Sequence, residues 1–171
     1  LGPHFTDDQL VIALDALISA ADNYPGLRPG RPPLTVSDIE QRLQDWGRFP
    51  GSRRVRDALS RAREGVESPK ETETRLVIVA AGLPEPVVQH EVYENGLLIA
   101  RCDMAYPDLK ITIEYEGDGH RTSRDQWRRD IQRQRELEDL GWIVIRVPQL
   151  DRAGDPGPLL DRIRRARSSR R

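Results

Sequence analysis

Cysteine and lysine are the residues that this sequence most clearly lacks. The single cysteine, Cys102, excludes a disulfide framework and a zinc site built from cysteine ligands. No apolar run is long enough to span a membrane and no secretory signal is visible, so a cytoplasmic protein is expected. Lys70 and Lys110 are the only lysines among 27 basic residues. Arginine is the better bidentate ligand for phosphate, although a GC-rich genome produces the same bias.

The charges that are present nearly cancel, because 27 basic residues stand against 28 acidic ones. The net charge therefore indicates no class of partner. A chain of 171 residues with 37% hydrophobic residues is long enough to bury the core of one compact domain with additional helices. The chain begins at Leu1 and not at a methionine, which predicts a fragment of a longer protein.

The first third of the chain is predicted to be helical. Amphipathic spacing is present over residues 6–21, 35–46 and 52–64, and a Pro/Gly-rich loop separates the first two of these segments. We expect residues 1–66 to form a small N-terminal helical segment, the end of a truncated upstream domain followed by a linker. Residues 67–171 are expected to form a separate α/β domain with a basic C-terminal tail.

The second domain is predicted to mix helices and strands. Ser68, Pro69 and Glu71 carry the signature of a helix start, with Ser68 as the cap and Glu71 closing a capping box. The pair Asn95-Gly96 predicts a β-hairpin. The order of elements predicts a mixed β-sheet flanked by helices on both faces. The expected elements are helices over residues 68–81, 123–140 and 158–171 and strands over residues 86–93, 97–106, 110–116 and 142–147.

Acidic residues gather at one end of a predicted strand pair. Asp103 lies on its first strand and Glu114 on its second, and pairing across the turn at Pro107 would bring the two carboxylates close together. Such carboxylates repel one another unless a divalent cation neutralises them, and magnesium prefers oxygen ligands. One interpretation is a metal site, and the other is a solvent-facing edge with ordinary surface charge. Strict alternation places Arg101, Asp103 and Ala105 on one face, which predicts a polar pocket cut into the core.

Several short motifs lie in a fixed order between residues 68 and 147. They are SPKET at 68–72, ARCD at 100–103, IEYEGDGHR at 113–121, Asp130 with Arg133, and LGW at 140–142. With these motifs the chain resembles the very-short-patch-repair endonuclease-like family of actinobacterial type, within the restriction-endonuclease-like PD-(D/E)XK superfamily. The resemblance covers about half of the chain. It implies a restriction-endonuclease-like α/β core.

Carried over residue by residue, the resemblance implies a metal-dependent nuclease site. Asp103 matches the central metal-binding aspartate, and Glu114 matches the second acidic position, with the Tyr115 carbonyl as a further metal ligand. His120 matches the histidine that this branch uses beside the metal, to accept a proton from the attacking water or to steady the phosphate. Glu71 would be the helix acid near the site, whereas its capping role is the structural alternative. The implied cofactor is Mg²⁺ or Mn²⁺.

One position departs from the superfamily signature, which has a lysine two residues after the second acid. Glu116 stands there instead, and it is a candidate catalytic residue because it could bind a second cation. Otherwise His120 and Arg121 could take over the work of the lysine, or the core could bind nucleic acid without cleaving it. The resembling members commonly carry an acid there too, usually aspartate.

Arginines are the expected contacts to nucleic acid, and three of them lie on the long helix after the acids. Arg133 could instead pair with Asp130, three residues away on the same helix. The Arg-rich C-terminal tail also suits salt-sensitive contacts with phosphate. The candidate nucleic-acid-binding residues are Arg101, Arg121, Arg128, Arg129 and Arg133.

The residues and the resemblance together predict a magnesium-dependent endodeoxyribonuclease, which hydrolyses DNA phosphodiester bonds in repair or defence. DNA is the expected partner, no membrane is involved, and a homodimer is compatible with the sequence. Two alternatives stay open. One is a catalytically inactive module that binds nucleic acid, and the other is a part of a toxin–antitoxin-type regulatory protein.

Overall fold

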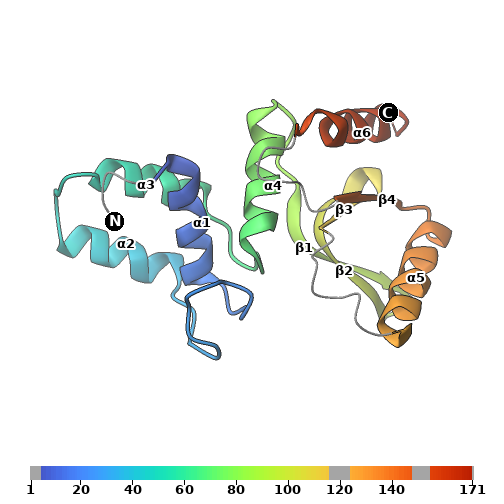
Figure 1. Cartoon of the computed structure of the whole chain (residues 1–171), viewed down its shortest axis with the longest axis horizontal. Helices are drawn as coiled ribbons and strands as arrows, with labels where there is room; N and C mark the ends of the chain where they lie inside the picture. Colours follow the sequence, from blue (N-terminus) through green and yellow to red (C-terminus); the bar gives the residue numbers. More distant parts are fainter. Residues whose placement is uncertain (1–4, 116–123, 148–154, 171) are drawn as a thin grey trace. The chain divides into compact units, whose positions relative to one another are not determined.

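Contacts within the chain divide it into two compact units, an N-terminal unit (Leu1–Leu76) and a C-terminal unit (Val77–Arg171). The computed structural model describes residues 5–115, 124–147 and 155–170, of which residues 124–127 are described by backbone alone. Helix α4 (Pro69–Ala80) is one continuous helix (Figure 1). The division falls inside it, so α4 contributes residues to both units. The boundary expected from the sequence lies earlier, just ahead of α4.

The N-terminal unit contains the helices that the amphipathic spacing predicted. Thr6 and Thr35 begin the first two with complete capping boxes, in which the hydroxyl accepts a backbone N–H and a side chain of the first turn accepts the N–H of the threonine. Apolar side chains of these helices and Leu76 of α4 form one buried cluster. The helices are α1 (Asp7–Ile18), α2 (Val36–Asp45) and α3 (Ser52–Arg61).

A buried ion pair joins α1 to α4 within the N-terminal unit. The Asp15 carboxylate is fully buried and lies 3.1 Å from an Nη atom of Arg75, which is buried as well. It also accepts hydrogen bonds from the Thr72 hydroxyl at 2.8 Å and from the Arg63 N–H at 2.7 Å. Burial raises the pKa of Asp15, whereas these hydrogen bonds and the charge of Arg75 act against that rise. The partners therefore compensate a charge that burial alone would disfavour.

The C-terminal unit is built on a four-stranded open sheet with strand order β1-β2-β3-β4. The first three strands pair antiparallel, and β4 pairs parallel to β3 after the crossover through helix α5 (Arg124–Asp139). The predicted mixed sheet is therefore confirmed. The strands are β1 (Val87–Glu94), β2 (Leu97–Tyr106), β3 (Ile111–Tyr115) and β4 (Ile143–Val147), with a short 3₁₀ turn η1 (Pro107–Leu109) between β2 and β3.

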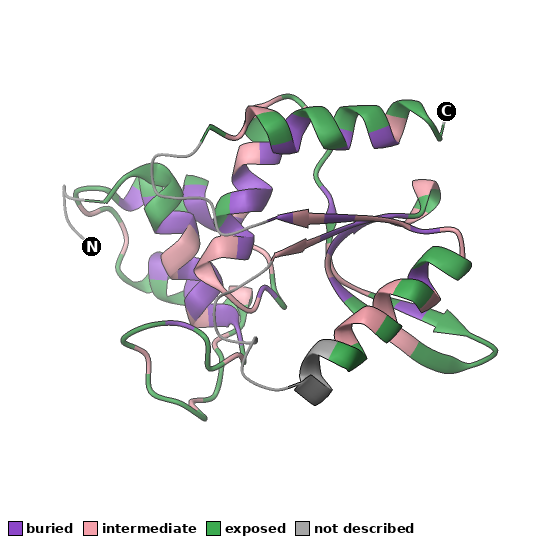
Figure 2. Ribbon diagram, turned by 45° about the vertical axis from the view of Figure 1, so that its right-hand side comes forward, coloured by how far each residue is buried: buried purple, intermediate pink, exposed green. Residues whose placement is uncertain are grey.

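Helices cover both faces of this sheet, as the sequence predicted (Figure 2). Helix α6 (Gly157–Ser168) packs Leu160 and Ile163 on one face, together with Ile78 at the end of α4. On the other face Leu137 of α5 packs in a second cluster with Cys102. The basic C-terminal segment is thus an ordered helix through Ser168.

Among the residues that the structure describes, no helix is long and apolar enough to cross a bilayer.

Candidate active site

Strand β2 changes faces beside Asp103. Cys102 and Ala105 belong to the cluster under α5, whereas Met104 belongs to the cluster under α6. A regular strand would place residues 102 and 104 on the same face. The predicted grouping of Arg101 with Ala105 through strict alternation is therefore wrong, because Ala100 and Cys102, which flank Arg101, share the α5-covered face with Ala105. The predicted polar pocket with Arg101 and Asp103 on that face is wrong as well, because Arg101 lies on the opposite side of the strand and is exposed.

The irregularity in β2 has a counterpart on the neighbouring strand. The register pairs Val88 with Met104 and His90 with Cys102, which places Gln89 across from Asp103. Gln89 has a φ of +48°, a left-handed conformation that is uncommon for residues other than glycine. Such conformations persist only where the surrounding structure enforces them, and they concentrate at functional sites. The backbone around Asp103 is thus set by both strands.

The structure brings Asp103 and Glu114 to the same end of the β2–β3 pair. The register aligns Met104 with Ile113, so its continuation by one residue places Asp103 opposite Glu114. The Asp103 carboxylate accepts a hydrogen bond from the Tyr115 N–H at 2.7 Å, which ties it to β3 directly. Tyr115, whose carbonyl was predicted as a metal ligand, is therefore part of the same group of residues.

The two oxygens of Glu114 have different partners. Oε1 accepts a hydrogen bond at 2.7 Å from the hydroxyl of Thr112, which is fully buried. That hydroxyl also lies 3.2 Å from the Met104 carbonyl, but its single proton serves one acceptor at a time, and the shorter contact is the one to the carboxylate. Oε2 lies 3.4 Å from an Nη atom of Arg133 on α5. Glu114 is thus anchored on one side and paired with a cation on the other.

Arg146 of β4 is a neighbouring cation that the sequence interpretation missed. The parallel register aligns it with Glu114, and its guanidinium donates to the Gln134 side chain of α5 at 2.7 Å. The sequence around Arg146 has the pattern of a buried strand, so its charge was not connected with the acids. A prediction that β4 lies beside β3 would have placed Arg146 next to Glu114.

Cys102 lies near the Glu114 carboxylate, and its thiol is expected to be unreactive. Burial, together with the charge of Glu114, raises the pKa of its thiol to about 12, while Thr112 and Arg133 act in the opposite direction. A thiol with this pKa is protonated at neutral pH. Cys102 is therefore a packing residue and not a nucleophile.

Glu71 belongs to the N-terminal unit, where its carboxylate caps α4. One oxygen accepts the Ser68 hydroxyl at 2.8 Å and the other accepts the Glu67 N–H at 3.0 Å. The predicted capping box is present with a shift of one residue, since the accepted N–H is that of residue 67 and not of the cap itself. These contacts supply the structural role that was the alternative to catalysis.

The other candidates lie partly outside the described residues. Glu116, His120 and Arg121 are all outside them. Arg101 is exposed on β2, across from Glu91 in the register, and Arg128 and Arg129 are exposed on α5. The candidates that the structure brings together are Asp103, Glu114, Tyr115 and Arg133.

The donor chemistry of this group suits a hard cation. Among the described residues no cluster of three or more His, Cys, Asp or Glu side chains has the arrangement of a metal site. Magnesium needs fewer protein ligands than that, because it is commonly held by one or two carboxylates and keeps several waters. Asp103, Glu114 and the Tyr115 carbonyl could supply such oxygen ligands.

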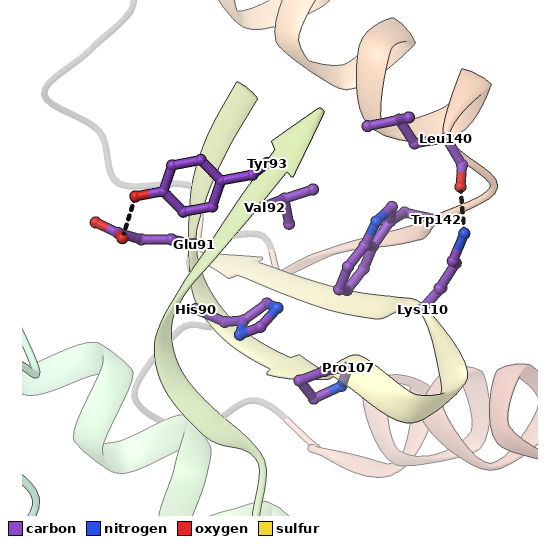
Figure 3. A pocket seen from close by; sticks show the side chains of 8 residues that line it. All are labelled: His90, Glu91, Val92, Tyr93, Pro107, Lys110, Leu140 and Trp142. Atoms are coloured by element: carbon purple, nitrogen blue, oxygen red, sulfur yellow. Dashed lines mark hydrogen bonds between the residues drawn. The ribbon is translucent and has the colours of Figure 1, made fainter. Parts of the chain in front are cut away.

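An open pocket of about 320 Å³ lies beside the α5-covered face of the sheet (Figure 3). His90 and Trp142 face each other in it with ring centroids 5.6 Å apart, and Lys110 donates to the Leu140 carbonyl at 3.0 Å. The lining contains neither Asp103 nor Glu114, so this pocket is separate from the candidate acids. Its residues are His90, Glu91, Val92, Tyr93, Pro107, Lys110, Leu140 and Trp142.

Comparison with known proteins finds two curated relatives. They are the uncharacterised protein Rv2248 of Mycobacterium tuberculosis strain ATCC 25618 / H37Rv and the uncharacterised protein MT2308 of strain CDC 1551 / Oshkosh. Each is 33% identical over 129 residues, which cover 75% of this chain and 48% of the relative. The chain thus spans about half the length of the curated relatives it matches. No family model matches the chain, and no solved structure matches it significantly.

Proposed function

We propose that this chain is the metal-dependent nuclease part of a cytoplasmic protein and that it hydrolyses DNA phosphodiester bonds with Mg²⁺ or Mn²⁺. The observation that carries the proposal is the meeting of Asp103 and Glu114 at one end of the β2–β3 pair, each fixed by a short hydrogen bond. The mixed sheet with helices on both faces is the architecture that a restriction-endonuclease-like core requires. The resemblance of the motifs to nucleases supports the same function.

The chemistry of the site follows from the two carboxylates. Asp103 and Glu114 would hold the cation, with the Tyr115 carbonyl as a further ligand. A bound Mg²⁺ lowers the pKa of a water molecule and offsets charge on the phosphate. Because the Tyr115 N–H fixes Asp103 and Thr112 fixes Glu114, neither carboxylate needs to reorganise far when the cation arrives. The protein's own contribution is this preorganised pair of anions.

Arginines exposed in the C-terminal unit would hold the DNA backbone. Arg128 and Arg129 lie on α5, the helix that also carries Arg133, and Arg101 lies two residues before Asp103 on β2. Contacts of this kind bind phosphate without reading the base sequence, and their strength falls as salt is added. DNA of any sequence is therefore the first substrate to test.

The proposal is tested by comparing the Asp103→Asn variant with the wild-type chain on plasmid and single-stranded DNA in Mg²⁺ or Mn²⁺. We expect the variant to lose cleavage by about 100-fold or more, because a bound metal supplies several kcal/mol of transition-state stabilisation. Asp108→Asn is the matched control, since Asp108 is an exposed aspartate in the turn of the same strand pair. Equal cleavage by wild type and Asp103→Asn would refute the assignment.

A second function is a module that binds nucleic acid without cleaving it. The observation that favours it is the cation already beside Glu114, because Arg133 neutralises a predicted metal ligand without any metal. Isothermal titration calorimetry with Mg²⁺ distinguishes the two functions. An inactive module would bind DNA but show neither metal binding nor cleavage, in wild type and variant alike.

A further inference from the structure

Helix α5 places the cation Arg133 beside Glu114. In the superfamily signature, the cation near this acid is a lysine from the same strand as the acid. The signature lysine stands two residues after the second acid, and this chain has Glu116 in that position. Arg133 comes from a different element and reaches Glu114 across the interface between α5 and the sheet. A positive charge is thus present at the acid even though the strand does not carry it.

The two contacts of Glu114 differ in strength. Thr112 is buried and donates at 2.7 Å, a normal distance for a strong O–H···O⁻ bond. The Arg133 contact is 3.4 Å long, and the arginine side chain is 42% exposed while that of Glu114 is 12% exposed. A long ion pair with one partner in solvent is weak. Oε2 is therefore the oxygen that can exchange its partner.

We propose that Arg133 occupies Oε2 of Glu114 in the metal-free protein and moves to a phosphate oxygen of DNA when a divalent cation takes that oxygen. This inference rests on the proposed nuclease function. A divalent cation attracts a carboxylate more strongly than a guanidinium does at the same distance, and the two cations repel each other. The released guanidinium has the geometry for bidentate contact with phosphate. Arg133 then does at the phosphate what the signature lysine would do.

Metal binding in the absence of DNA gives the first test. Calorimetry with Mg²⁺ should show about two- to fivefold tighter binding to Arg133→Gln than to wild type, because a competing ion pair with an exposed partner contributes no more than that factor. The matched control is Arg135→Gln, which removes the same charge from an exposed position on the same helix. The control should bind Mg²⁺ no more tightly than wild type.

DNA binding gives the second test, which does not depend on turnover. With Ca²⁺ in place of Mg²⁺ and a phosphorothioate duplex, Arg133→Gln should bind more weakly than Arg135→Gln, and its salt slope should be smaller by about one. In EDTA the two variants should bind alike, because Arg133 is then held by Glu114. Arg133→Lys should recover part of the lost DNA affinity, because lysine keeps the positive charge but cannot make the bidentate contact of a guanidinium with phosphate.

Two results would overturn the inference while leaving the nuclease intact. Equal Mg²⁺ affinities of the two glutamine variants would show that Arg133 does not compete for Oε2. Weaker Mg²⁺ binding by Arg133→Gln would show that Arg133 merely holds Glu114 in place. A wild-type chain without metal binding would remove the proposed function itself, and the inference with it.

Discussion

At the scale of single residues, burial separates two kinds of carboxylate in this chain. Asp15 is enclosed with three donors, of which Thr72 and Arg75 are buried themselves. Glu114 is mostly buried but keeps one oxygen against a half-exposed arginine. The first arrangement serves stability, because an enclosed ion pair is costly to break. The second leaves room for exchange, which a binding site requires.

The buried pair predicts a large stability loss on removal of one partner. Asp15→Asn should lower the free energy of unfolding by about 3–5 kcal/mol, because Arg75 would stay buried without a counter-charge. Urea unfolding measures this change. Asp8→Asn, which removes an ion pair of two partly exposed side chains with Arg61, should cost under about 1 kcal/mol. Similar losses for both variants would contradict the assigned role of burial.

At the scale of elements, Glu71 at the N-terminus of α4 has two candidate roles, which are helix capping and catalysis. Its two hydrogen bonds at residues 67 and 68 give it a capping role. We therefore expect Glu71→Gln and Ser68→Ala to destabilise the chain by a similar amount, about 0.5–2 kcal/mol each. Both should keep DNA cleavage close to that of the wild type under conditions where the chain is folded. Thermal unfolding and plasmid cleavage, measured on the same samples, check this pair.

A loss of cleavage confined to Glu71→Gln would assign Glu71 to catalysis instead. Ser68→Ala is an informative companion because it disturbs the same cap without removing an acid.

The elements also show what the sequence could and could not predict. The capping boxes at Thr6 and Thr35 and the hairpin turn at Asn95 depend on neighbouring residues, so local patterns were sufficient for them. The face switch beside Asp103 was missed, because it lies across from a positive φ at Gln89 on the neighbouring strand, which local patterns in β2 do not contain. Period-two alternation assumes a regular strand and has no access to that partner.

The candidate site divides in the same way. The approach of Asp103 and Glu114 followed from a single turn between paired strands, which is a local property. The contact of Arg133 with Glu114 depends on how the crossover helix lies on the sheet, and so does the place of Arg146. A helix periodicity gives the face of a helix but not the residue that it meets across an interface.

At the scale of the whole chain, the sharing of α4 between two units has a measurable consequence. Thr72, Arg75 and Leu76 pack in the N-terminal unit, while Ile78 packs under the sheet. A fragment of residues 67–171 would lack Asp15 and the apolar cluster around Leu76. We expect its amide protons at 69–76 to exchange faster than in the full chain, with the strands still protected. Hydrogen exchange by mass spectrometry measures this.

Retained protection of residues 69–76 in that fragment would show that the first turns of α4 are stable without the N-terminal helices. The full chain, measured under the same conditions, is the reference.

The left-handed conformation of Gln89 in β1 has a further consequence, which concerns aggregation at high protein concentration. β1 is the outer strand of an open sheet, and exposed Val87 and Tyr93 would make a flat version of it a template for strands of other molecules. The left-handed conformation of Gln89 departs from the extended backbone that such pairing requires, and the acid Glu91 follows it on the same strand. We therefore expect the distortion that lies across from Asp103 to disfavour edge-to-edge aggregation as well.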